Sequence, residues 1–208
     1  MGALLLLPFF LIRFGLLALL NREAIKRAAY FAPLLGKEKT AYWIYQIANV
    51  AIVLGLFFYN VKTARLFLFC VGIVVYLLGA ILLAVSVINF SSPSENGVNQ
   101  NGLYRLSRNP MYVAYFLFFL GCALLVQSWL LFGLVLVIQI AAHWIIRSEE
   151  RWCAERFGEA YFQYREKVRR YFEAQKIRGC LKTIKRPKKV VFFRPLAPIF
   201  LLYASMPA

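Results

Sequence analysis

The sequence predicts an all-α integral membrane protein with about five transmembrane helices, including a C-terminal helical hairpin, followed by amphipathic cytoplasmic helices. Hydrophobic residues make up 62% of the 208-residue chain, and they lie in runs long enough to cross a bilayer. Lysine and arginine outnumber acidic residues by 25 to 9, and they flank those runs. Positive-inside topology and contact with an anionic leaflet explain this charge better than nucleic-acid binding, which we do not expect.

Three apolar runs form the predicted N-terminal part. The first, Ala3–Leu20, would reach about 27 Å as a helix, close to a bilayer core of about 30 Å. We expect Arg13, near its middle, to snorkel or to face a partner helix. The second run is Ala41–Tyr59, and the third is Leu66–Phe90, which carries no charge. Two glycines of the third run favour close helix contact, Gly72 and Gly79.

The next apolar stretch predicts a helical hairpin. Residues 111–146 would extend about 54 Å as one helix, which is too long for a single crossing. We therefore expect a break near Gln127 and Ser128. A polar loop, 91–109, precedes this hairpin and is rich in Ser, Asn and Gly. Its last residue, Asn109, is a favourable helix N-cap, and Pro110 is suited to the first helical turn.

The chain changes from mainly apolar to strongly charged after Ile146. Residues 147–194 contain 15 Lys or Arg and 6 Glu, and aromatic side chains recur there at intervals of mostly three and four residues. This pattern predicts amphipathic helices interrupted at Gly158. Residues 176–189 carry seven basic side chains and should adhere to an anionic leaflet. We expect residues 190–208 to lie on the membrane surface, with a sixth crossing as the alternative.

The distribution of basic residues predicts the topology. Residues 21–40, residues 91–109 and the C-terminal tail should all face the cytoplasm. Five spans with the N-terminus outside satisfy all three at once, so we predict a multi-pass protein whose functional site faces the cytoplasm.

The residues that the chain lacks exclude several chemistries. It has no Asp, and its one histidine is His143, so a histidine zinc cluster and a Ser-His-Asp triad are excluded, and we expect no metal. It has no glycine-rich phosphate loop and no dinucleotide fingerprint. Its four cysteines form no C-x-x-C pair, and nothing indicates a disulfide framework.

Polar residues on the predicted cytoplasmic side gather in three clusters. In the first, residues 101–112, a helix N-terminus lies beside Arg105 and Arg108, and this fits either a plain helix cap or a site for a carboxylate or phosphate. The second follows the hairpin, and its members His143, Arg147 and Glu150 share a helical face while Glu149 lies on another. The third cluster consists of Phe157, Gly158, Tyr161, Tyr164 and Arg165.

These clusters form an ordered pattern. It reads G-x-Y-x-x-x-R-N-P-M-Y from Gly102 to Tyr112, then an apolar hairpin, then E-E-x6-F-G-x-x-Y-x-x-Y-x-x-x-V from Glu149 to Val168. The pattern resembles the isoprenylcysteine carboxyl methyltransferases and their phospholipid methyltransferase relatives. The resemblance covers about a third of the chain. Two positions depart from it, since the family usually has His at Asn109 and Gly at Ala114.

The resemblance implies a membrane-embedded methyltransferase that uses S-adenosyl-L-methionine in a site without a Rossmann fold. Its implied catalytic residues are Arg108, Glu149 and Glu150. Its implied cofactor-binding residues are Tyr104, Asn109, Pro110, Tyr112, His143, Arg147, Tyr161 and Tyr164. We accordingly divide the chain into three transmembrane helices over residues 1–90, a cofactor-binding catalytic region over 91–175, and a basic membrane-associated tail over 176–208.

The expected acceptor is amphiphilic or lipidic. A carboxylate of the isoprenylcysteine type is favoured because it needs only a cation, such as Arg108 or Arg147, to orient it. A phospholipid amine or a small thiol remains open and would need a base, for which Glu149, Glu150 or His143 would serve. Two other functions stand beside methyl transfer: a membrane reductase of the sterol reductase type that uses NADPH, and a non-catalytic membrane module or small transporter.

Overall fold

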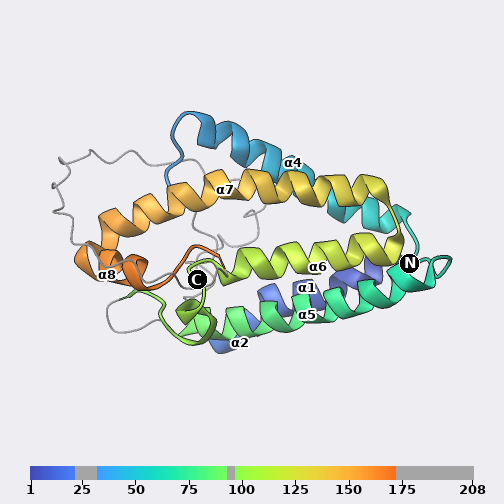
Figure 1. Cartoon of the computed structure of the whole chain (residues 1–208), viewed down its shortest axis with the longest axis horizontal. Helices are drawn as coiled ribbons and strands as arrows, with labels where there is room; N and C mark the ends of the chain where they lie inside the picture. The colour runs from blue at the N-terminus through green and yellow to red at the C-terminus, as the bar shows by residue number, and fades with distance from the viewer. Residues whose placement is uncertain (22–31, 93–96, 172–208) are drawn as a thin grey trace, which may run out of the picture. The chain divides into compact units, whose positions relative to one another are not determined.

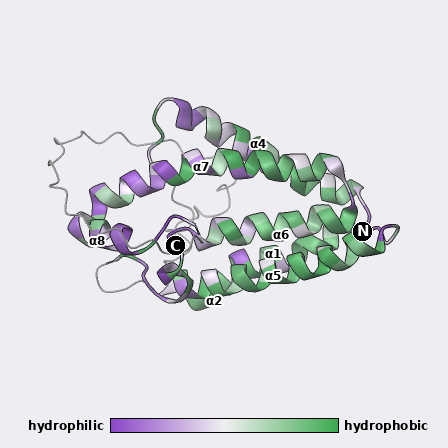
Figure 2. Ribbon diagram, in the orientation of Figure 1, coloured by the Kyte–Doolittle hydropathy of each residue, from purple (hydrophilic) through white to green (hydrophobic). Residues whose placement is uncertain are grey.

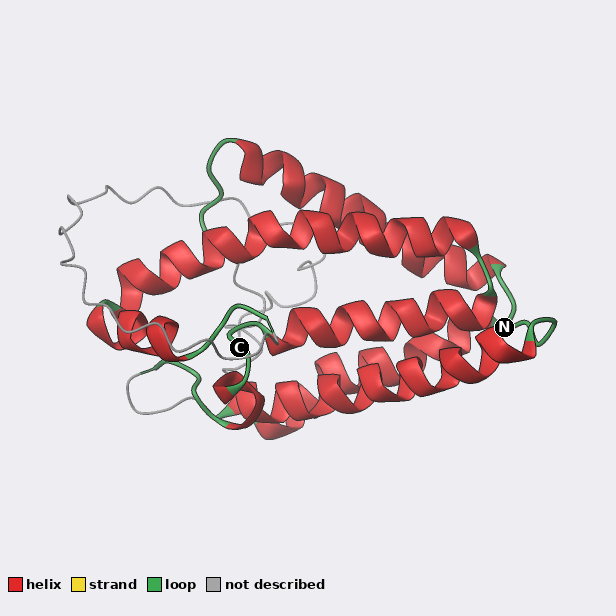
Figure 3. Cartoon of the chain, in the orientation of Figure 1, coloured by secondary structure: helices red, strands yellow, loops and turns green. Residues whose placement is uncertain are grey.

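The computed structural model describes residues 1–21, 32–92 and 97–171, all within one compact unit, Met1–Phe172 (Figure 1). The regular structure of these residues is helical, and they contain no strand (Figure 3). The predicted all-α membrane class is confirmed. Residues 22–31 of the first basic segment and the predicted tail, 176–208, lie outside the described residues.

The first predicted span is one continuous helical stretch, Gly2–Leu20. Its middle is a π-helical turn, which holds Arg13. A π turn is wider than an α turn and shifts the angular position of the residues that follow it. The parts of this stretch are η1 Gly2–Leu6, α1 Leu7–Phe10, η2 Leu11–Leu16 and α2 Leu17–Leu20.

The second and third spans are α4, Lys37–Phe58, and α5, Leu66–Ser91. Helix α4 begins at Lys37 rather than at the expected Ala41. The reason is that Glu38 makes favourable contacts in the first turn. Its Oε2 accepts a hydrogen bond from the backbone N–H of Leu35 at 2.9 Å, and both of its oxygens accept bonds from Arg151 at 2.7 Å.

The predicted hairpin consists of α6, Pro110–Val126, and α7, Trp129–Phe157. The break falls at the expected pair. Gln127 adopts the left-handed conformation (φ 51°), and the hydroxyl of Ser128 accepts a hydrogen bond from the backbone N–H of Leu131 at 3.4 Å. A left-handed residue followed by an N-cap ends one helix and starts the next within two residues.

Helix α7 continues past Ile146, where the sequence suggested that the hairpin ends. The residues that follow are mainly strong helix formers, with no Pro or Gly before Gly158. Gly158 (φ 53°) ends α7, as the pattern predicted, and α8 follows at Glu159–Lys167. A helix of 29 residues is about 43 Å long, so the last turns of α7 extend beyond a bilayer core of about 30 Å.

Glycines allow α5 and α6 to pack closely. A Cβ atom at Gly79 would overlap the backbone of Phe118, and one at Gly121 would lie 2.5 Å from the Cα of Tyr76. A Cβ at Gly72 would lie 3.1 Å from the backbone N of Leu125. The predicted close contact at Gly72 and Gly79 is therefore confirmed. Helices α4 and α7 also pack side by side, and α6 contacts α7 (Figure 1).

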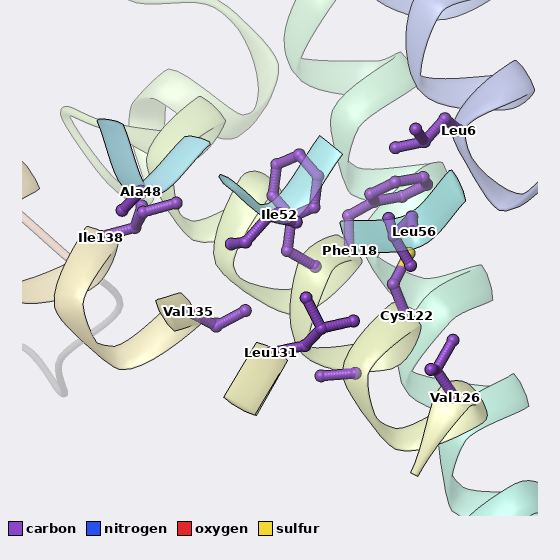
Figure 4. Packing of buried hydrophobic residues seen from close by; sticks show 12 residues of the cluster. Leu6, Ala48, Ile52, Leu56, Phe118, Cys122, Val126, Leu131, Val135 and Ile138 are labelled. Atoms are coloured by element: carbon purple, nitrogen blue, oxygen red, sulfur yellow. The ribbon is translucent and has the colours of Figure 1, made fainter. Parts of the chain in front are cut away.

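The core lies among α4, α6 and α7. Ile52, Leu56, Phe118, Val126 and Leu131 are at most 1% exposed and pack together (Figure 4). Many large apolar side chains on the outer helix surfaces are exposed, as lipid-facing residues must be. Among the described helices, four are long and apolar enough to span a membrane, and α6 is apolar but has 17 residues. The number of five spans remains a prediction.

The described residues of two predicted cytoplasmic segments, 21–40 and 91–109, lie at one end of the helix bundle. The side chain of Asn21 donates to the backbone carbonyl of Ser91 at 3.1 Å, and Arg151 binds Glu38 across α7 and α4. Hydrophilic residues gather at the end of α7 and along α8 (Figure 2). That this end faces the cytoplasm remains a prediction from the basic residues.

Candidate functional site

The site begins with the loop before α6. Gly102 has φ +52°, and a Cβ atom there would overlap the side chain of Asn89, so this position requires glycine. The residues that follow it form a short 3-10 turn, η3, Gly102–Arg105. This turn buries Tyr104, which is 8% exposed. The first residues of the predicted motif are therefore fixed against the end of α5.

The segment after α8 holds this loop in place through backbone contacts. The backbone N–H of Arg108 donates to the carbonyl of Arg169 at 2.8 Å, and the Ser107 hydroxyl donates to the carbonyl of Arg170 at 2.9 Å. Asn109 occupies the N-cap position of α6 and Pro110 its first turn, as predicted. The Asn109 side chain makes no capping bond, and its amide donates to the carbonyl of Arg170 at 3.3 Å.

Glu150 is bound by two arginines from different segments. Its Oε1 lies 3.2 Å from Nη2 of Arg108 and 3.0 Å from Nε of Arg170, and Nη2 of Arg170 binds Oε2. The side chains of Arg108 and Glu150 are 10% and 11% exposed. The hydrogen bond to Glu150 raises the pKa of Arg170, which therefore stays charged. We call Arg108, Glu150 and Arg170 the arginine–glutamate cluster.

Arg108 keeps hydrogen-bonding capacity inside this cluster. Its Nε and Nη1 atoms are buried and have no hydrogen-bond partner within the described part of the chain. A buried N–H of a guanidinium without an acceptor is costly, so these two atoms indicate a place for an anionic oxygen group. The structure thus favours the anion-site interpretation of this loop over the plain helix cap.

Glu149 has a different hydrogen-bond partner from Glu150. The hydroxyl of Tyr112 in α6 donates a hydrogen bond to its Oε1 at 2.7 Å. Arg13, on the π turn of the first span, interacts electrostatically with Glu149 and with Tyr115. The two adjacent glutamates therefore lie in separate environments, as their angular positions on a helix predicted.

Tyr161 and Tyr164 join α8 to the loop. Both are buried, at 4% and 6% exposed, and they pack with Val98 and Val168. The hydroxyl of Tyr164 donates to the backbone carbonyl of Tyr104 at 2.6 Å. Burial raises the pKa of both tyrosines above the ordinary value, so both hydroxyls keep their protons at neutral pH. In this structure the two tyrosines hold the loop in place. That they also close a cofactor pocket remains a prediction.

His143 and Arg147 lie apart from these contacts. Both are exposed on α7, and the guanidinium of Arg147 stacks on the ring of Trp144, 5.3 Å from its centroid. Arg147 and Glu150 both line an open pocket, whereas His143 does not line it. The predicted binding roles of His143 and Arg147 remain predictions.

At two positions the structure shows contacts that the sequence pattern did not indicate. Arg170 was missed, because two adjacent arginines after an amphipathic helix resemble ordinary surface charge, and their contact with Glu150 arises in the folded chain. Ala114, which departs from the family pattern, is fully buried with Leu17, Leu83 and Val87. Its methyl group therefore fills a helix–helix contact.

Comparison with known families supports the motif. Residues 84–160 match the family model described as phospholipid methyltransferase, a family of membrane methyltransferases. These residues run from the end of α5 to the start of α8 and include the loop, the hairpin and both glutamates. Comparisons with curated proteins and with solved structures gave no match. The family match, which covers less than half of the chain, confirms the predicted resemblance to the phospholipid methyltransferases over residues 84–160.

Proposed function

We propose that this protein transfers a methyl group from S-adenosyl-L-methionine to an amphiphilic or lipidic acceptor. The observation that carries the proposal is the convergence of three motif segments at one end of the bundle. Arg108 contacts Glu150, Tyr112 contacts Glu149, and Tyr164 contacts the backbone of Tyr104. These segments are far apart in the sequence, and a shared site is the simplest reason for a common pattern of spacing among them.

The residues present fit this methyl donor. The donor carries a carboxylate, and the buried Nε and Nη1 atoms of Arg108 each offer a charged N–H group that could bind it. The donor also carries an ammonium group. The Glu150 carboxylate lies beside Arg108, so together these two side chains could bind the ammonium and the carboxylate of the donor's amino acid moiety. When bound, S-adenosyl-L-methionine supplies a methyl group on a positively charged sulfur.

The two glutamates are suited to different tasks. Both oxygens of Glu150 are already bound by arginine N–H groups, which suits this carboxylate to a positioning role. Glu149 accepts a hydrogen bond from the neutral hydroxyl of Tyr112 rather than from an arginine, and it is the better candidate for a base. A carboxylate acceptor would need no base, whereas an amine or thiol would give up its proton to Glu149.

The membrane location suits an amphiphilic acceptor. The arginine–glutamate cluster lies at the polar end of the bundle, where a soluble donor can reach it from water. The apolar helices below it provide a path along which a lipid chain can approach sideways. We favour an acceptor of the isoprenylcysteine carboxylate type, and a phospholipid amine is the acceptor that the family description suggests.

The test is to incubate the detergent-purified full-length protein with methyl-labelled S-adenosyl-L-methionine and a membrane extract, and then to identify the labelled product. We expect label in an extractable lipid or prenylated fraction. Base-labile label indicates a methyl ester on a carboxylate, whereas base-stable label indicates an amine or thiol acceptor. Binding of NADPH without binding of S-adenosyl-L-methionine, measured by titration, would favour the reductase instead.

A further inference from the structure

An open pocket of about 280 Å³ lies beside the charged part of α7. Pockets for drug-sized ligands typically enclose about 300–1,000 Å³, so this one is suited to a small polar group. The residues that line it are Arg147, Glu150, Arg151, Ala154, Arg165 and Arg170.

Two of these arginines are not bound by a carboxylate within the described residues. Glu150 is already bound by the arginines of its cluster, and Arg151 is bound by Glu38. Arg147 and Arg165 contact aromatic rings, and within the described residues they make no hydrogen bond or ion pair. The pocket therefore attracts an anion.

The aromatic contacts orient the two guanidinium groups. Arg147 lies over the ring of Trp144 at 5.3 Å, and Arg165 lies over the ring of Phe162 at 5.4 Å. Stacking on a ring restrains the plane of a guanidinium and leaves its N–H edge available to a ligand. A planar fork of N–H donors matches the oxygens of a phosphate group.

The position of the pocket along α7 corresponds to the lipid headgroups. The apolar part of α7 ends at Ile146, and the lining begins at Arg147. Trp144 lies one turn earlier, and tryptophan is enriched at the boundary between hydrocarbon and headgroups. A ligand here would meet the membrane surface.

We propose that this pocket binds the phosphate group of an anionic phospholipid, held by Arg147 and Arg165. The proposal does not depend on the methyltransferase activity, and it gives the expected contact with an anionic leaflet a defined place on α7. S-Adenosyl-L-methionine is proposed to bind at Arg108 and Glu150, whereas Arg147 and Arg165 lie outside that cluster, so we assign these two arginines to the lipid.

The test is an equilibrium titration of the full-length protein in detergent with three probes: short-chain phosphatidylglycerol, phosphatidylcholine of the same chain length, and inorganic phosphate. The variants are Arg147→Gln, Arg165→Gln and the double substitution. Arg156→Gln is the matched control, because Arg156 is an exposed arginine of α7 that does not line the pocket. Both pocket arginines are exposed, so the variants should fold, and thermal unfolding in the same detergent checks this.

A basic residue beside an anionic lipid surface contributes about 1 kcal/mol, so each single substitution should weaken phosphatidylglycerol binding about fivefold and the double about 25-fold. Arg156→Gln should change it less than twofold, and phosphatidylcholine should bind more weakly than phosphatidylglycerol. Equal effects of Arg156→Gln and Arg165→Gln, or equal binding of the two lipids, would overturn the site. Inorganic phosphate that binds as tightly as phosphatidylglycerol would overturn the lipid assignment in favour of a soluble anion.

Discussion

The spanning part of the bundle and its polar end are held together by different interactions. In the spanning part, glycines bring α5 and α6 into backbone contact, and apolar side chains fill the core among α4, α6 and α7. At the polar end, side chains bind backbone carbonyls and arginines bind glutamates, as at Ser107 and Glu150. Substitutions in the spanning part should therefore act on folding, whereas substitutions at the polar end should act on the geometry of the site.

The largest expected effect is at the polar end. Glu150→Ala leaves the buried guanidinium of Arg108 without its carboxylate, which costs on the order of 3–5 kcal/mol, or about 150- to 5,000-fold in turnover. Arg108→Ala leaves Glu150 paired with Arg170 but removes the buried N–H groups proposed to bind the donor, so we expect turnover to be lost there as well. Insertion into the membrane should be unaffected. The measurement is methyl transfer from the labelled donor, with Arg105→Ala, an exposed arginine of the same loop, as the control. Activity like that of the wild type in either variant would remove that residue from the site.

The next effect tests the spanning part. Gly79→Ala places a methyl group against the backbone of Phe118, and overpacking of this kind costs about 1–3 kcal/mol. Gly133→Ala is the control, because nothing lies within 4 Å of a Cβ there. Thermal unfolding in detergent should show a lower midpoint for the Gly79 variant and no decrease for the Gly133 variant. Equal shifts would show that α5 and α6 do not depend on this glycine.

An effect of similar size separates the two glutamates. Tyr112→Phe removes the hydrogen bond to Glu149 and leaves the arginine–glutamate cluster intact. Such a bond to a charged group contributes about 1.5–3 kcal/mol, so we expect turnover to fall by about 10-fold or more. Binding of the donor, measured separately by titration, should stay within twofold. A loss of donor binding instead would place Glu149 on the donor side of the site.

The smallest effect concerns the loop and α8. Tyr164→Phe removes the bond to the carbonyl of Tyr104 and should lower the free energy of unfolding by about 1 kcal/mol at neutral pH. Burial raises the pKa of Tyr164, so above pH of about 10 the unfolded chain loses this proton while the folded chain keeps it. Stability should therefore fall as pH rises above about 10. Unfolding curves between pH 8 and 11 should show a shallower fall in the variant, and identical slopes would contradict this assignment.

Part of the site followed from sequence position alone. Spacing on a helix predicted that Glu149 and Glu150 lie on different faces, and the family pattern includes Arg108 and Tyr112, which contact these two glutamates. The same spacing placed Arg147 on the face of Glu150, and both line the pocket, yet Arg147 is exposed while Glu150 is buried. Helical periodicity gives the direction of a side chain, but not which neighbouring segment covers it.

The sequence by itself determined the apolar spans, the break at Gln127 and Ser128, the start of α6 at Pro110 and the end of α7 at Gly158. Each of these follows from local quantities, namely hydropathy over a helix length and the conformational preferences of single residues. The tertiary structure alone decided that Arg170 shares Glu150 with Arg108 and that Arg13 interacts electrostatically with Glu149. Ion pairs join residues that are distant in the chain, and their partners are chosen by how the helices pack.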